Sequence, residues 1–196
     1  MRTLLAARHA ETELNVSSVL NGDPSVEVAL TAAGREQARR LGEVAGPVDL
    51  VVHSPFGRTR ATAELAWPGA PSLEVAELGE FRYGSFEGTR WDDGFAEWTR
   101  LSGPLDECPG GGESRAAAAA RYARGFQIVA ERPEERIALV AHGIHVACLL
   151  LGRDGRPPPP VVEQVPFATG YELTEAELLR AAGVLATWAA DPSWHT

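Results

Sequence analysis

The stretch that decides the fold is Leu4-Leu5-Ala6-Ala7-Arg8-His9-Ala10-Glu11-Thr12-Glu13-Leu14-Asn15. It is a short apolar run that stops at an arginine and a histidine. Four or five apolar residues bounded by polar ones predict a buried strand of an α/β sheet. The ligand crevice of an open parallel sheet lies at the carboxyl ends of its strands, so we expect Arg8 and His9 to lie in such a crevice.

Arg8 and His9 together indicate phosphoryl transfer. A histidine has an unperturbed pKa of about 6.5, so its neutral form is available as a nucleophile near pH 7. The arginine stays charged, and its planar guanidinium matches the oxygens of a phosphate group. For this pair alone, the alternative is a histidine that merely caps the strand and takes no part in chemistry.

The chain has 196 residues, of which 44% are hydrophobic and 23% are charged, and this length and composition suit one α/β domain over residues 1–196. The net charge of -9 argues against a nucleic-acid or anionic-membrane partner. Cys108 and Cys148 form no CxxC pair, so neither a zinc site nor a disulfide framework is indicated. No apolar run reaches the roughly 18 residues of a membrane helix. Arg8 interrupts the first run too early for a signal peptide, so we expect a cytoplasmic protein.

Strand and helix patterns alternate along the chain. The expected strands cover residues 3–7, 48–52, 73–75 and 137–141, with a candidate edge strand over 165–173. The expected helices cover residues 31–45 and 58–66, a stretch from Ser114 that Pro133 closes, residues 143–151, and a short last helix that opens on a capping box at Thr174 and closes at Gly183. Residues 77–112 are expected to be a long irregular region over the pocket. The β-α-β order predicts a three-layer α/β/α sandwich with a mainly parallel central sheet.

Three of the expected strands end in polar residues. Arg8-His9 follows the first strand, Ser54-Pro55-Phe56-Gly57-Arg58 follows the second, and His142-Gly143 follows residues 137–141. Helix N-termini present free N–H groups and suit an anion. Two histidines and two arginines that converge there fit a phosphoryl group and its three oxygens.

Six segments, in the same order along residues 4–151, resemble the motifs of the histidine phosphatase superfamily, also called the phosphoglycerate mutase-like family. Any one of them is weak evidence, but all six in order are very specific. The segments are Arg8-His9-Ala10-Glu11-Thr12 with Asn15, Leu30-Thr31-Ala32-Ala33-Gly34-Arg35-Glu36-Gln37-Ala38, Ser54-Pro55-Phe56-Gly57-Arg58 with Thr62-Ala63, Leu78-Gly79-Glu80 with Gly84, Glu87 and Gly88, Pro109-Gly110-Gly111-Gly112-Glu113-Ser114, and Val140-Ala141-His142-Gly143.

The resemblance implies a role for each matching residue. His9 is expected to become the phosphohistidine, and Glu80 to protonate the leaving oxygen and then to activate water. The residues expected to bind the phosphate are Arg8, Asn15, Arg58, His142 and Gly143. Phosphoryl transfer needs positioning and charge neutralisation, and a carboxyl in a partly apolar pocket can hold a proton near neutral pH. His142 acts best as a cation, whereas His9 must be neutral and held in one tautomer by a partner that the sequence does not name.

The sequence departs from the family pattern at two positions. Ala10 stands where the family has glycine; a methyl group can restrict the backbone there, but it is the smallest change and we expect it to be tolerated. His145 stands three residues beyond His142, where a metal pair is imaginable, but no third ligand is evident and the family needs no metal. We therefore expect His145 on the helix surface or the pocket wall. His53 is expected to be structural, and His195 to have no role.

The segment from Glu80 to Glu107 bears on the substrate. It holds six aromatic residues, and seven acids against three arginines. One interpretation is a small satellite core under a long loop, and the other is an aromatic, acidic entrance that disfavours polyanions. The sequence leaves both open.

The resulting prediction is a phosphatase that hydrolyses a small phosphate monoester through phosphohistidine, without cofactor or metal. The alternatives are a phosphoglycerate or phosphosugar mutase, and a non-catalytic protein that binds a phosphorylated ligand. The expected partner is the small-molecule ester, with no nucleic acid and no membrane, and a homodimer is left open.

Overall fold

The structure is a computed structural model that describes residues 2–194, so His195 lies outside the described residues. The strands are β1 (Thr3–Arg8), β2 (Leu50–His53), β3 (Ser72–Glu74), β4 (Arg136–Ala141) and β5 (Gly170–Thr174). The helices are α1 (Glu13–Val16), α2 (Ala32–Ala45), α3 (Gly57–Ala66), α4 (Ala96–Leu101), α5 (Arg115–Ala130), α6 (Gly143–Arg153) and α7 (Glu175–Ala190). Three short turns, Ala76–Leu78, Gly84–Phe86 and Trp91–Phe95, lie between β3 and α4.

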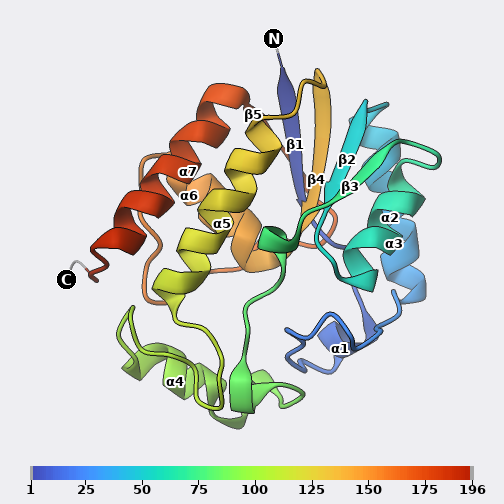
Figure 1. The fold of residues 1–196 in the computed structure, drawn as a ribbon. Coiled ribbons are helices and arrows are strands. Elements are labelled where there is room, and N and C mark those ends of the chain that lie inside the picture. Colours follow the sequence, from blue (N-terminus) through green and yellow to red (C-terminus); the bar gives the residue numbers. More distant parts are fainter. Residues whose placement is uncertain (1, 195–196) are drawn as a thin grey trace.

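The strands form one sheet in the order β3-β2-β4-β1-β5. Every neighbouring pair runs parallel except β1 and β5, which are antiparallel at the edge. In Figure 1 the helices α5, α6 and α7 cover one face of the sheet, and α2 and α3 cover the other. The expected three-layer α/β/α sandwich with a mainly parallel sheet is confirmed.

Both faces of the sheet are buried, which explains why its strands are continuous apolar runs. Leu4 and Ala6 of β1 belong to the large core under α5 and α7, whereas Ala7 packs in a second core with Leu41 of α2 and Ala63 of α3. Successive side chains of a strand point to opposite faces of the sheet. When both faces are covered, every position of the strand is buried and apolar residues are favoured throughout. The run that opens the chain is therefore the central, doubly covered part of the sheet.

The expected helix starts are seen in the structure. The side chains of Thr31, Ser114 and Thr174 each accept a hydrogen bond from a backbone N–H in the first turn of α2, α5 and α7. The capping box at Thr174 is complete, because the Glu177 side chain also accepts from the N–H of Thr174. Such caps satisfy N–H groups that have no partner inside the helix.

The expected end of the last helix at Gly183 is wrong. Helix α7 runs through Gly183 to Ala190, and its buried face continues past the glycine with Leu185 and Trp188. A glycine inside a helix costs about 1 kcal/mol relative to alanine. Burying a leucine and a tryptophan in the core that α7 shares with α5 and α6 contributes more than that, so the packing of this face overrides the local signal.

The edge strand is shorter than expected. It pairs with β1 only over Gly170–Thr174, while residues 165–168 cross the carboxyl end of β1, where the Ala168 N–H donates to the Arg8 carbonyl at 3.0 Å. The second strand also begins two residues later than expected, at Leu50. The crossing segment thereby forms part of the site.

The segment between β3 and α5 lies beyond the carboxyl ends of the strands, at the bottom of Figure 1. The expected irregular region at 77–112 contains one helix, α4. No helix within residues 2–194 has the length and apolar character needed to cross a membrane.

Candidate active site

A polar cavity of about 210 Å³ lies at the carboxyl end of β1. Five of the expected site residues line it: Arg8, His9, Asn15, Arg58 and Glu80. His142, which follows β4 and caps α6, is fully buried and contacts two of these side chains. Parallel strands end at one edge of the sheet, so residues far apart in the sequence meet here.

His9 is held in one neutral tautomer. Its Nδ1 lies 2.8 Å from the carbonyl oxygen of Ala10, which can only accept, so Nδ1 carries the proton. Its Nε2 accepts from Nε of Arg58 at 3.2 Å, so this nitrogen is unprotonated and carries the lone pair of the ring. Burial, with the charge of Arg58 second, holds the pKa of His9 well below its usual value. The partner that the sequence could not name is thus the next carbonyl along the chain.

Arg58 connects the two histidines. It is the second residue of α3, its guanidinium is buried, and its Nη2 lies 3.1 Å from Nδ1 of His142. Asn21 anchors the other side of the group with both its side-chain oxygen and its carbonyl oxygen. Burial lowers the pKa of Arg58, and the charge of Glu80 opposes that shift.

His142 is also held in a single orientation. Because Arg58 can only donate to Nδ1, the proton of the neutral ring lies on Nε2, which is 2.9 Å from Oγ of Ser54. Burial lowers the pKa of His142 well below its usual value, and Arg58 lowers it further. A cation is expected here from the sequence, whereas burial and the charge of Arg58 favour the neutral ring. An added negative charge such as a phosphate would favour the cation.

Glu80 is the carboxyl group of the cavity. Its Oε2 lies 3.9 Å from Nη2 of Arg58 and 3.5 Å from Nδ1 of His142, and its Oε1 accepts from the N–H of Phe81 at 2.8 Å. Burial raises the pKa of Glu80, and the arginine beside it only partly opposes this. A buried carboxyl with a raised pKa can hold a proton near neutral pH and donate it.

Arg8 forms the opposite wall. Its guanidinium lies 3.7 Å from the ring centroid of Phe167, and its Nη1 donates to the carbonyl of Val165 at 2.9 Å. Burial lowers its pKa to about 10, so it remains charged at neutral pH. Its Nε is buried and has no hydrogen-bond partner within residues 2–194, so this donor is unsatisfied by the described part of the chain.

The two remaining binding residues lie at the edge of this arrangement. Asn15 lines the cavity, but its oxygen accepts from Thr12, so only its NH2 group is left for a ligand. Gly143 begins α6, and a Cβ there would lie 2.7 Å from Oε1 of Gln164 and 3.2 Å from Nε of Arg8. Gly143 therefore permits the close approach of the Arg8 side chain to the helix start.

Sequence reasoning missed four residues at or beside this cavity. Nothing in the sequence marks Asn21 as a site residue, and Ser54 enters only as part of a motif, yet the two hold Arg58 and His142 in place. Tyr83 and Gln164 line the cavity. No local pattern marks these residues, because their contacts are made across the fold.

The structure corrects the expectation for His145 and bears on two others. The expectation that His145 lies on the helix surface or pocket wall is wrong: it is fully buried, and its ring centroid lies 3.6 Å from that of Tyr122. Ala10 is fully buried in a small cluster with Leu30 and Ala38, so its methyl group has room. His53 is buried outside the cavity, with Nδ1 2.8 Å from the carbonyl of Ser54, which suits a structural role.

The two interpretations of the 80–107 segment are each half right. Phe95 lies at the centre of an aromatic cluster, with Tyr83, Trp91 and Trp98 all within 5.5 Å of its ring centroid, so the segment does form a satellite core. Tyr83 and Trp91 also line the cavity. Glu80 is the one acid of this segment among the residues that line it, so the entrance is aromatic rather than acidic.

Comparisons with known proteins agree with this geometry. The sequence profile of the histidine phosphatase superfamily (branch 1) matches residues 4–177. A curated 2,3-bisphosphoglycerate-dependent phosphoglycerate mutase of Brucella canis is 28% identical over 179 residues, which cover 83% of this chain and 86% of that protein.

Two solved structures are similar to the chain as a whole. One is a putative alpha-ribazole-5'-P phosphatase of Escherichia coli, with 25% identity, a TM-score of 0.73, and coverage of 88% of this chain and 90% of that one. The other is the protein TTHB049 of Thermus thermophilus, with 31% identity, a TM-score of 0.67, and coverage of 87% of this chain and 92% of that one.

Proposed function

This chain belongs to the histidine phosphatase superfamily and is a histidine-dependent phosphatase, and we propose that it hydrolyses a small phosphate monoester through a phosphohistidine intermediate on His9. One observation carries the proposal: a histidine with an unprotonated Nε2, two arginines and a carboxyl with a raised pKa share one cavity. Arg8 and Arg58 together balance the two negative charges of a phosphate dianion.

In the first step, Nε2 of His9 attacks the phosphorus atom. The N–P bond forms while the P–O bond to the alcohol breaks, and protonated Glu80 gives its proton to the departing alkoxide. Arg8 and Arg58 hold equatorial oxygens, where the charge of the transition state lies, and His142 can donate to another once the phosphate favours its cation, which carries a proton on Nδ1 as well. The carbonyl of Ala10 keeps the proton on Nδ1 and stabilises the phosphorylated ring.

In the second step, the ionised Glu80 takes a proton from a water molecule. The water oxygen attacks phosphorus, the N–P bond breaks with its electron pair returning to Nε2, and inorganic phosphate leaves. The enzyme returns to neutral His9 and protonated Glu80, so the same carboxyl serves both steps.

The main alternative is a mutase, because the curated relatives bear that name. A mutase must exclude water from the phosphohistidine and bind substrates with several negative charges. Among the residues that line the cavity, Arg8 and Arg58 are the two permanently charged cations, and both are needed for the transferred group. A second phosphate would therefore meet no further arginine in the described lining.

A non-catalytic binding protein is the other alternative. Such a protein needs cations but gains nothing from a buried carboxyl, because an acid beside the phosphate repels it when ionised. The position of Glu80, 3.5 Å from His142 and 3.9 Å from Arg58, thus favours catalysis.

The test is release of inorganic phosphate from a panel of monoesters, with acid quenching avoided so that the phosphoenzyme can be trapped. We expect a phosphoenzyme that is labile in acid and stable in base, as a phosphoramidate is. α-Ribazole 5'-phosphate belongs in the panel, because similar solved structures carry that substrate in their names. A 31P NMR time course on 3-phosphoglycerate separates the alternatives: isomerisation that outruns phosphate release would favour the mutase, and no turnover of any ester would favour the binding protein.

A further inference from the structure

A second cavity, of about 350 Å³, adjoins the polar one. Trp91 and Gln164 line both cavities, so one ligand can reach from one into the other past these two side chains. Trp91 is half-buried and Gln164 is exposed, which places the boundary at an accessible position. The volume lies in the range of small-molecule sites, about 300–1,000 Å³.

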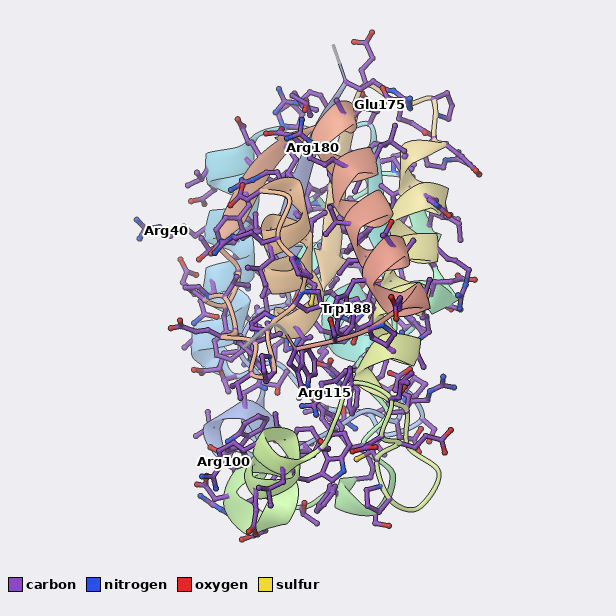
Figure 2. All side chains as sticks on the ribbon, turned by 90° about the vertical axis from the view of Figure 1, so that its left-hand side faces the viewer. Arg40, Arg100, Arg115, Glu175, Arg180 and Trp188 are labelled. Carbon is purple, nitrogen blue, oxygen red and sulfur yellow. The ribbon has the colours of Figure 1, made fainter. Side chains whose placement is uncertain are left out.

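The walls of the second cavity are apolar. They come from the aromatic cluster around Phe95, from the small residues Ala118 and Ala119 of α5, from the connector at 158–162, and from Trp194. Arg115 is the one permanently charged residue among the described lining residues. Its guanidinium donates to the carbonyls of Thr99, Ser102 and Pro160, and its Cζ lies 5.1 Å from the ring centroids of both Trp98 and Trp194. Figure 2 labels Arg115 near Trp188. Both Nη atoms of the one cation in the described lining are thus already bonded to backbone carbonyls.

Three polar atoms of the lining residues have no partner. Nε of Arg115, the hydroxyl group of Tyr122 and Nε1 of Trp194 are buried without a hydrogen bond to any residue within 2–194, and the last two belong to uncharged side chains. Tyr122 is almost completely buried, and burial raises the pKa of its hydroxyl well above the usual value, so it keeps its proton and can donate. A buried donor without a partner costs free energy unless a ligand supplies an acceptor.

We propose that the second cavity binds the alcohol part of the substrate, and that this part is an uncharged apolar group with a hydrogen-bond acceptor that reaches Tyr122 and Trp194. The phosphate then lies against His9 and Arg58 in the polar cavity, and the ester crosses between Trp91 and Gln164. This inference rests on the proposed function, because it assigns the leaving group of that reaction. It excludes sugar bisphosphates and other polyanions as preferred substrates.

The experiment uses a series of n-alkyl phosphates from ethyl to octyl. All have primary alkoxide leaving groups of similar basicity, so differences in kcat/KM report how well the alkyl chain binds and not how easily the P–O bond breaks. We expect kcat/KM to rise roughly fourfold with each methylene that enters the cavity. A flat series, or one that falls with length, would overturn the proposal.

A matched pair of variants locates the effect. Ala118→Met places a longer side chain in the cavity, whereas Ala117→Met makes the same change at an exposed position of the same helix. We expect Ala118→Met to reduce the ratio of kcat/KM between octyl and ethyl phosphate at least tenfold, and Ala117→Met to leave the ratio unchanged. An equal octyl-to-ethyl ratio of kcat/KM in the two variants would show that the alkyl chain of the ester does not bind in this cavity.

The acceptor is tested with Tyr122→Phe, which removes one oxygen atom. We expect 6-methoxyhexyl phosphate to lose several-fold in kcat/KM in this variant, while heptyl phosphate, which has no acceptor, does not lose. Equal losses for both esters would contradict a hydrogen bond from Tyr122.

Alkylphosphonates separate this inference from the proposed function. Their C–P bond cannot be hydrolysed, so calorimetry measures their binding whether or not the protein is a phosphatase. Length-dependent binding without turnover of any ester would keep the cavity assignment and reject the function. Turnover with no dependence on length, in esters or phosphonates, would keep the function and reject the assignment.

Discussion

The polar and the apolar cavity differ in the origin of their walls. The polar cavity takes its histidines and arginines from the end of β1, the start of α3 and the residue that follows β4, all placed by the sheet, and only its acid, Glu80, from the irregular segment after β3. The apolar cavity has one helical wall, from α5 and α6, and its other walls are the irregular segment around Trp91, the connector at 158–162 and Trp194. The phosphate-binding groups thus depend mainly on the rigid scaffold, whereas the proposed choice of substrate depends more on loops, which can change without loss of the core.

The two cavities also differ in hydrogen bonding. In the polar cavity His9, Arg58 and His142 each have a fixed partner, in Ala10, Asn21 and Ser54 respectively. In the apolar cavity the donors of Tyr122 and Trp194 are unpaired within the described part of the chain. Substitutions in the first should therefore reduce turnover of every ester, and substitutions in the second should matter only for esters that fill it.

The largest effect is expected for His9→Ala. Removal of the nucleophile should lower kcat by several orders of magnitude for ethyl and octyl phosphate alike, because it removes the step common to both. Calorimetry with octylphosphonate serves as the control and should still detect binding in the apolar cavity. Retained turnover in this variant would reject the mechanism. A loss confined to long esters would show that His9 acts on the alkyl group, and the two cavities would then not have separate roles.

The next largest effect is expected for Glu80→Gln, which keeps the shape of the side chain and removes its ionisable proton. Turnover of alkyl phosphates should fall about 10²- to 10⁴-fold, and that of nitrophenyl phosphate much less, because its leaving group needs little protonation.

The pKa of Glu80 is raised by burial, so wild-type kcat should fall as the pH rises through that pKa, and the variant should lack this limb of the pH profile. Glu74→Gln, at an exposed position of β3, is the matched control. Equal losses on both ester types would mean that Glu80 is not the acid.

The sequence was most informative where local patterns decide structure. The run at residues 4–7 and the polar residues that follow three strands were enough to expect the sheet and to name Arg8, His9, Arg58 and His142. Asn15 and Glu80 were expected only from the resemblance to the family. The apolar cavity could not be predicted, because Trp91, Tyr122 and Trp194 meet only through tertiary packing. The end of α7 was misjudged for the same reason: Gly183 is a local stop signal, and the buried contact of Trp188 that overrides it is non-local.

A smaller effect is expected for His145→Leu, at the residue between the two cavities. Burial holds the pKa of His145, like those of His9 and His142, well below the usual value, so the folded protein keeps all three neutral while the unfolded chain takes up protons below about pH 6.5. The unfolded state then binds more protons, and the free energy of unfolding falls as the pH falls, by about 1.4 kcal/mol per pH unit for each such histidine.

His145→Leu should remove one of these three contributions while kcat/KM near pH 7.5 changes little, because His145 touches neither His9 nor Glu80. Denaturant unfolding at pH 7.5, 6 and 5 measures the slope, with the wild-type chain as reference. An unchanged slope would show that His145 is already protonated in the folded state, and a large loss of kcat would make it part of the polar cavity.

The smallest effect, none at all, is expected from removal of metal. Both nitrogens of His142 already face other groups, Arg58 and Ser54, and the ring of His145 packs on Tyr122 instead of facing the cavity. Within residues 2–194 no three histidine, cysteine or acidic side chains gather as a metal site would need.

Incubation with EDTA should thus leave kcat unchanged. Vanadate, which adopts the five-coordinate geometry of the transferring phosphoryl group, should inhibit at low concentration. Vanadate should compete equally with ethyl and octyl phosphate, since it occupies the polar cavity alone. Inactivation by EDTA that zinc reverses would instead make His142 a ligand and would replace the arginine-based account of the polar cavity.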